Sequence, residues 1–183
     1  MTDTDGPGRY RHLTFNAPLS DGRAESIVRR LVAAAPQAVV DVGCGWGELL
    51  LRIAERSPST LGLGIDIDER NLRRGRDAAR LRGLADRVNF ENFSADEITQ
   101  EADLVICIGS SHAFGDTMQA LRSLMQMVRP GGRLLFGDGL WDPSATTDRS
   151  LVWDDMLELP DLAGLVEAAV AIGYRPLFVE TST

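Results

Sequence analysis

Short apolar runs alternate along this chain with longer segments in which apolar residues recur every three or four positions. The apolar runs occupy residues 38–42, 61–66, 88–93, 103–108, 133–137 and 175–179. Runs of this length predict strands, and the periodic segments between them predict helices. The alternation is typical of an α/β domain in which a mostly parallel sheet carries helices on both faces and a ligand binds beyond the carboxyl ends of the strands.

The periodic segments also predict where helices begin and which side chains they bury. Ser20 is a good N-cap for the first helix, because its hydroxyl can accept a hydrogen bond from the first turn. The helix before the run 133–137 should bury four apolar residues at helical spacing, namely Met118, Leu121, Met125 and Val128. We expect residues 20–183 to form one domain, preceded by a lid or flexible segment over residues 1–19.

Three glycines alternate with other residues where the run 38–42 ends, in the sequence Asp41-Val42-Gly43-Cys44-Gly45-Trp46-Gly47. Glycines at a strand-to-helix turn let the backbone approach a ligand closely, and the next helix presents free N–H groups there. A dinucleotide fingerprint would place its third glycine at position 48, which is Glu48. The spacing therefore argues against a nicotinamide-dependent oxidoreductase.

A second acid, Asp66, ends the next predicted strand, 25 residues after Asp41. Because parallel strands end at the same edge of a sheet, both carboxylates should lie at the ligand edge. The pair of acids and the alternating glycines together resemble the first motifs of class I S-adenosylmethionine-dependent methyltransferases, which have a Rossmann-like, three-layer αβα fold.

This resemblance implies a set of cofactor contacts. The loop residues Gly43, Cys44, Gly45 and Gly47 would surround the methionine part of S-adenosylmethionine, and Asp41 would help to orient its amino group. Asp66 would bind both ribose hydroxyls, because a carboxylate can accept two hydrogen bonds. The remaining contacts would come from Ile67 on adenine, Ser94 and Ala95 at the adenine edge, and Ile108 and Gly109 at the methionine end.

Candidate substrate residues lie in three other places. Tyr10 and Phe15 belong to the N-terminal segment, which covers the site in similar methyltransferases, and Trp141 follows the run 133–137. His112 lies among small residues just beyond the central run 103–108. It is a candidate for substrate contact and general base, and the alternative is a structural histidine that orders its loop.

The number of strands differs from that of the fold which the motifs resemble. That fold has seven strands, and the last of them is antiparallel, whereas six apolar runs are present here and the seventh strand is missing. Strand six could pair differently, a second chain could complete the sheet as in a homodimer, or the chain could be shortened.

Composition narrows the choice of partners. The chain has 27 acidic and 19 basic residues and a net charge of −8, which argues against nucleic acid or an anionic membrane and favours a small-molecule substrate. All 19 basic residues are arginines, which excludes Schiff-base chemistry through lysine. The two cysteines have no metal-site spacing, so we expect no metal. The chain has neither a membrane-length apolar run nor a signal peptide, and we therefore expect a cytoplasmic protein.

The function expected from these features is methyl transfer to a small-molecule acceptor by in-line displacement, with S-adenosylhomocysteine left behind. Two alternatives stay open. The domain could bind S-adenosylmethionine without methylating, as a binding module or as an enzyme that uses the sulfonium for another reaction such as cyclisation. A nicotinamide-dependent oxidoreductase is the less favoured alternative, because Glu48 occupies the position of the third fingerprint glycine.

Overall fold

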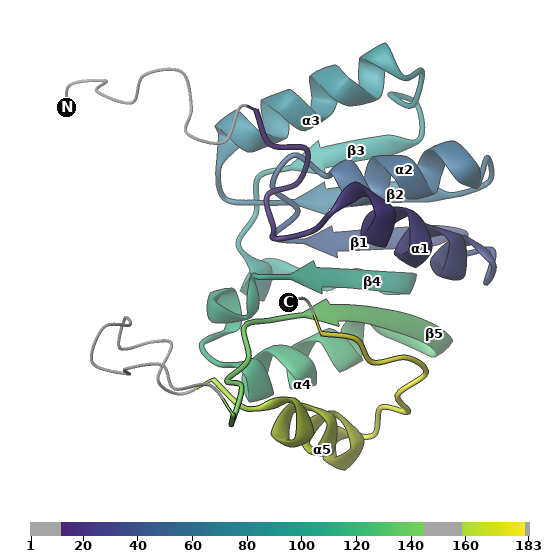
Figure 1. Cartoon of the computed structure of the whole chain (residues 1–183). Coiled ribbons are helices and arrows are strands. Elements are labelled where there is room, and N and C mark those ends of the chain that lie inside the picture. Colours follow the sequence, from purple (N-terminus) through teal and green to yellow (C-terminus); the bar gives the residue numbers. More distant parts are fainter. Residues whose placement is uncertain (1–11, 145–158, 182–183) are drawn as a thin grey trace, which may run out of the picture.

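A single parallel sheet organises the protein, for which the computed structural model describes residues 12–144 and 159–181. Its strands are β1 (Ala38–Val42), β2 (Leu61–Ile65), β3 (Val88–Glu91), β4 (Ala102–Ile108) and β5 (Val128–Gly137). They lie in the order β3-β2-β1-β4-β5, and every neighbouring pair is parallel. The carboxyl ends of all described strands consequently meet at one edge of the sheet (Figure 1).

Helices cover both faces of this sheet, as the sequence predicted. The helices are α1 (Asp21–Val32), α2 (Glu48–Arg56), α3 (Glu69–Leu81), α4 (Thr117–Met127) and α5 (Leu162–Ile172), with single 3-10 turns η1 (Ala95–Glu97) and η2 (Ser111–Phe114). The first three pack on one face, α4 packs on the other, and α5 lies against α4 (Figure 1). The α/β class, with helices on both faces of a parallel sheet, is therefore confirmed.

Alternation along the strands divides the apolar core into two layers. Val39 and Leu104 point to the face that buries Leu50 of α2, whereas Val40 and Val105 point to the face covered by α4. Successive strand residues point to opposite faces, so both sides of a central strand must be apolar. This requirement explains why β1 and β4 are almost uninterrupted apolar runs.

The buried face of α4 differs from the predicted one. Thr117, Ala120, Leu121, Leu124 and Met127 are buried, whereas the predicted Met118, Met125 and Val128 are only partly buried. Two neighbouring stripes of this helix both have helical spacing. The stripe that packs on the sheet contains the small Ala120, which lets the helix approach closely.

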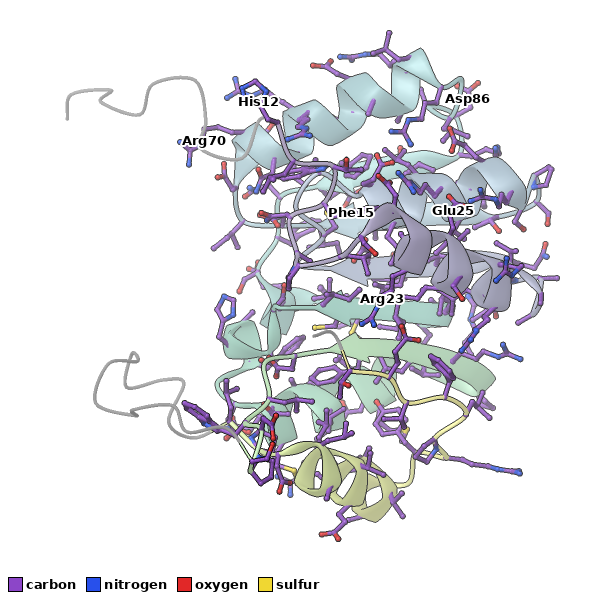
Figure 2. All side chains as sticks on the ribbon, in the orientation of Figure 1. His12, Phe15, Arg23, Glu25, Arg70 and Asp86 are labelled. Atoms are coloured by element: carbon purple, nitrogen blue, oxygen red, sulfur yellow. The ribbon has the colours of Figure 1, made fainter. Side chains whose placement is uncertain are left out.

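The strand predicted at 175–179 is wrong. These residues form no ladder with any described strand, and the segment is tied to α1 instead. Arg23 pairs with Glu180 at 2.9 Å and donates to the Thr181 carbonyl at 2.8 Å, and the Arg30 guanidinium lies 3.6 Å from the centre of the Phe178 ring. Figure 2 shows Arg23 on α1 beside this segment. Apolar alternation predicted an extended segment but cannot supply a hydrogen-bonded neighbour.

Within the described ranges, no helix has the length and apolar character needed to cross a membrane.

Candidate functional site

The glycine loop joins β1 to α2 at the ligand edge of the sheet. Gly43, Gly45 and Gly47 have φ angles of 66°, 57° and 65°, a left-handed conformation that side-chain-bearing residues rarely adopt. A Cβ on Gly43 would collide with the side chain of Ser110, which follows β4. The loop therefore needs glycine both for its backbone conformation and for its close packing against the next strand end.

Asp66, directly after β2, holds this loop in place. One carboxylate oxygen accepts from the Gly45 N–H at 2.8 Å, and the other accepts from the Asp68 N–H at 2.8 Å. The Cys44 N–H donates to the carbonyl of Ile65, the residue before Asp66, at 2.9 Å. An ionised carboxylate has about four acceptor positions. Two of them are used here, so Asp66 retains the capacity to accept from two ligand hydroxyls.

Asp41, in β1, is a buried carboxyl group at the same edge, with only 5% of its surface exposed. Burial, and secondly the negative charge of Asp66, raise the pKa of Asp41 to about 8. No described arginine or histidine forms an ion pair with it. Two acids that repel each other beside a glycine loop form an environment that favours a cationic ligand.

We predict that Asp41 makes the stability of the ligand-free protein fall as the pH rises. The pKa of Asp41 is about 8 in the folded protein against an ordinary value of 3.8, so the folded state holds an additional proton between these values. The contribution of Asp41 to the free energy of unfolding is thus most favourable below pH 4 and is lost as the pH approaches 8. Between these values the free energy of unfolding falls by at most about 1.4 kcal/mol for each pH unit. Thermal unfolding of the wild type and of Asp41→Asn between pH 5 and pH 8 measures this. A pH-independent difference between the two proteins would contradict it.

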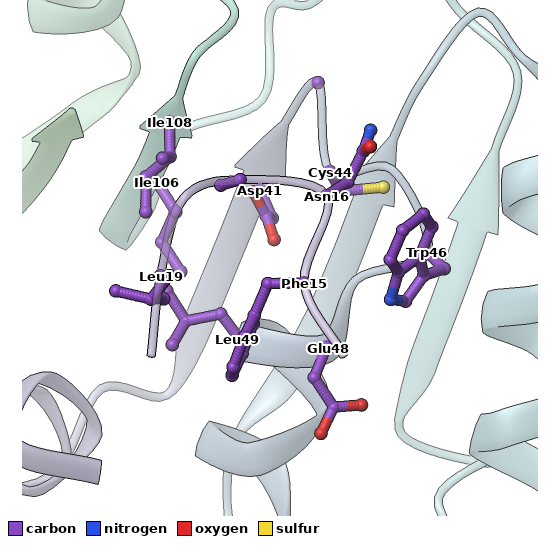
Figure 3. Close-up of a pocket in the computed structure, with 12 residues that line it drawn as sticks. Phe15, Asn16, Leu19, Asp41, Cys44, Trp46, Glu48, Leu49, Ile106 and Ile108 are labelled. Atoms are coloured by element: carbon purple, nitrogen blue, oxygen red, sulfur yellow. The ribbon is translucent and has the colours of Figure 1, made fainter. Parts of the chain in front are cut away.

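A small pocket lies between this edge and the segment before α1. Residues Phe15, Asn16, Ala17 and Leu19 line one side of it, and Asp41, Gly43, Cys44, Trp46, Glu48, Leu49, Ile106 and Ile108 line the other. Figure 3 shows Phe15 beside Leu49 and below Asp41 in that view. The cavity volume is about 40 Å³, which is enough for a few water molecules. A larger ligand would have to extend along the rim or displace the segment.

The residues predicted for adenine lie at the ends of β2 and β3. Ile67 is 78% exposed, and its carbonyl accepts from the Asn92 side chain at 3.0 Å. Ser94 caps η1, where its N–H donates to Glu97 at 3.0 Å, and Ala95 is buried. The exposed Ile67 side chain offers an apolar surface to a flat ring, since covering it would remove that surface from water.

The end of β4 brings the candidate base to the same side of the molecule. Gly109 continues the sheet by donating to the Gly137 carbonyl at 2.8 Å, and the Ser110 hydroxyl donates to the Gly43 carbonyl at 3.3 Å. His112 follows on η2 with an exposed side chain. The loop that carries His112 thus contacts the glycine loop directly.

The other predicted substrate residues are more dispersed. Tyr10 lies outside the described residues. Phe15 is buried, with the Arg52 guanidinium 4.9 Å from its ring centre, so it forms part of the pocket wall. Trp141 is half-buried and bridges to Asp161 at the base of the connection that ends at α5.

The cysteines are free thiols that differ in exposure, Cys44 being half-buried and Cys107 buried. Burial, and then the charge of Asp41, raise the pKa of the Cys107 thiol to about 12 and that of the Cys44 thiol well above its ordinary value. The Cys44 thiol donates to the Gly45 carbonyl at 3.3 Å. Both side chains therefore stay neutral, and Cys44 contributes to the loop as a small polar group.

Two residues that were not predicted from the sequence, Asn16 and Arg74, lie against the glycine loop. Asn16 lies against the loop, since a Cβ built on Gly45 would be only 3.0 Å from its Cβ. Arg74 stacks on Trp46 with its guanidinium 3.7 Å from the ring centre. No motif marks either residue, because each contact depends on how distant segments of the chain pack together.

Comparison with known proteins gives a consistent result. Residues 40–134 match a family model described as a methyltransferase domain. The 27-O-demethylrifamycin SV methyltransferase of Amycolatopsis mediterranei is 35% identical over 113 residues, which are 60% of this chain and 41% of that protein. This chain therefore spans less than half the length of that relative.

Two solved structures resemble the fold closely. YjhP of Escherichia coli has a TM-score of 0.81 at 24% identity, with 92% of this chain and 70% of that chain covered. A methyltransferase of Geobacter sulfurreducens in complex with S-adenosylhomocysteine has a TM-score of 0.75 at 24% identity, with 87% and 66% covered. At this identity the likeness establishes a shared fold, which is Rossmann-like as expected.

Proposed function

This chain belongs to the methyltransferase domain family, and from that membership we propose that it transfers a methyl group from S-adenosylmethionine to a small-molecule acceptor. Within the site, the proposal rests mainly on the placement of two acidic residues. A buried acid, Asp41, and a loop-holding acid, Asp66, lie on either side of the glycine loop at the edge where parallel strands bind their ligands.

The residues present fit the parts of this cofactor. Asp66 has acceptor capacity for the two ribose hydroxyls, and the exposed Ile67 can cover one face of adenine. Asp41 can pair with the α-ammonium group, and it must lose its proton to do so because its pKa is about 8. Ile108 and Gly43 border the same pocket and would enclose the methionine end.

S-adenosylmethionine, when bound, supplies a methyl group whose bond to sulfur breaks as the acceptor forms its new bond, and the electron pair stays on sulfur. The protein therefore contributes mainly by placement, which is worth roughly 7–11 kcal/mol in favourable cases. Asp66 and the glycine loop would hold the donor. The η2 turn follows Ser110, whose hydroxyl donates to the Gly43 carbonyl of this loop.

We assign His112 as the general base for a hydroxyl acceptor. Its imidazole is exposed on η2, and its loop touches the glycine loop through the Ser110 hydroxyl. An exposed imidazole at this position can take the acceptor's proton as the new bond forms. Asp138 is the second candidate for a carbon acceptor, although its carboxylate already accepts from the Thr117 hydroxyl at 2.9 Å.

Product analysis tests this function. Incubating the protein with S-adenosylmethionine and a panel of small hydroxyl, amine and carbon acceptors should release S-adenosylhomocysteine in step with a methylated product. Binding of S-adenosylmethionine without release in any reaction would favour the binding-module alternative. A rearranged acceptor without release would favour a sulfonium-assisted reaction, and tight binding of reduced nicotinamide cofactor would favour the oxidoreductase.

The expected partners and location are part of the same proposal. We propose that the protein works in the cytoplasm on a small molecule and that it can form a homodimer. Two free thiols, Cys44 and Cys107, are consistent with a reducing compartment. Analytical ultracentrifugation and cell fractionation test the assembly and the location separately.

A further inference from the structure

A short segment before α1 crosses the glycine loop, and we call residues 13–19 the strap. Two backbone carbonyls of the strap accept hydrogen bonds from outside it. The Trp46 indole N–H donates to the Thr14 carbonyl at 2.8 Å, and the Arg74 guanidinium donates to the Leu13 carbonyl at 2.6 Å. The strap is thus attached both to the loop that contains Trp46 and to α3, which carries Arg74.

Arg74 and Trp46 also bind each other, and we call this pair the clasp. The guanidinium lies 3.7 Å from the centre of the indole ring, and the ring is only 4% exposed. A guanidinium stacked on an indole at this distance is attracted by the ring electrons. One side chain, Arg74, therefore orients the indole and holds the strap at the same time.

Behind the clasp, the strap closes over the cofactor pocket. Phe15 is 7% exposed against Leu49, and Asn16 lies against Gly45. The cavity beneath has a volume of only about 40 Å³. A nucleoside with an amino acid tail is several times larger, so such a ligand has to extend along the rim beside the strap or displace it.

We propose that Arg74 is a positioning residue that keeps the strap closed on the glycine loop and thereby sets how long the bound nucleoside stays. This inference rests on the proposed function. The clasp suits the role because its contacts connect the strap, the glycine loop and α3, and none of them involves a strand of the sheet. The strap continues into α1 through Ser20, whose side chain caps that helix, so among the described contacts its other end is held by Trp46 and Arg74.

The experiment compares Arg74→Leu with Arg73→Leu. Arg73 precedes Arg74 on the same helix and is exposed, and its side chain has no hydrogen bond or ion pair to another described residue, so its replacement removes a matched charge without touching the strap. Hydrogen exchange of the strap amides, followed by mass spectrometry on the ligand-free protein, measures opening. Stopped-flow displacement of S-adenosylhomocysteine measures release.

We expect Arg74→Leu to speed both exchange in the strap and release of S-adenosylhomocysteine by about tenfold, because the variant loses the hydrogen bond to Leu13 and the cation–π contact with Trp46. Arg73→Leu should match the wild type in both. Trp46→Phe keeps an aromatic ring but removes the donor to the Thr14 carbonyl, so it should also speed strap exchange and ligand release. This variant replaces Arg74→Leu in the experiment if Arg74→Leu folds poorly.

Each outcome decides a separate point. Unchanged strap exchange in both variants would overturn the clasp, and faster exchange with unchanged release would overturn its control over the ligand. A wild-type protein that does not bind S-adenosylhomocysteine would overturn the proposed function. The exchange measurement on the ligand-free protein would still report whether Arg74 holds the strap.

Discussion

Replacing Asp66 by alanine should weaken binding of S-adenosylhomocysteine by about 100-fold to 1,000-fold, which corresponds to roughly 3–4 kcal/mol. Two losses combine in this variant. The ribose hydroxyls lose their acceptor, and the N–H groups of Gly45 and Asp68 lose theirs, so the loop that encloses the ligand also loses its support. Isothermal titration calorimetry measures the change directly.

A matched control for this variant is Asp86→Ala. Asp86 is exposed and lies just before β3, at the opposite end of the sheet, far from Phe15 (Figure 2). Its removal changes the net charge equally but should leave the affinity within about twofold, since exposed charges at this distance are screened. Equal affinities of Asp66→Ala and wild type would remove Asp66 from the binding site.

Replacing His112 by alanine should slow methyl transfer to a hydroxyl acceptor by about 100-fold or more, because a general base typically contributes about 10²–10⁴-fold. Binding of S-adenosylhomocysteine should be nearly unchanged, since the imidazole is exposed on η2 and forms no part of the pocket lining. Single-turnover formation of S-adenosylhomocysteine, with the acceptor saturating, separates the chemical step from binding.

Added imidazole provides the control for His112→Ala. A missing base can be replaced in part by the free base in solution, whereas a missing structural contact cannot. Partial recovery of turnover with imidazole would support a role in proton removal. Full activity of the variant without imidazole would make His112 a structural residue of its loop.

The placement of both acids and the glycine loop at one edge of the sheet could be predicted from sequence, because it depends on a general property of parallel sheets. Asp41 and Asp66 end neighbouring strands, and the paired register Val42 with Ile65 brings these ends to the same edge. The glycine spacing at 43, 45 and 47 predicted a loop of unusual backbone conformation, and all three φ angles are positive. These features are local, so a single segment of sequence contains the information.

Predictions that required long-range partners were less successful. The run 175–179 has the alternation of a strand, yet Arg23 and Arg30 hold this segment on α1, and no sequence pattern identifies those contacts. The helix α4 offers two stripes of helical spacing, and the packing of Ala120, Leu124 and Met127 against the sheet distinguishes them. In each case the decisive information is the neighbour in space.

The chemistry of the acids also depends on their surroundings. Sequence alone places two carboxylates at the ligand edge but does not reveal that they differ. Asp41 is buried and has a raised pKa, whereas Asp66 accepts two backbone N–H groups that hold the loop. The two acids therefore differ in burial and in hydrogen bonding, and these differences depend on the fold around them.

A crystal structure of the protein grown with S-adenosylhomocysteine tests most directly whether this edge of the sheet binds the cofactor. We expect density for the ribose hydroxyls at the Asp66 carboxylate, adenine on Ile67, and the amino acid end beneath the strap near Asp41. A rim that stays filled by Phe15 and Asn16, with no density for the nucleoside at saturating ligand, would contradict it.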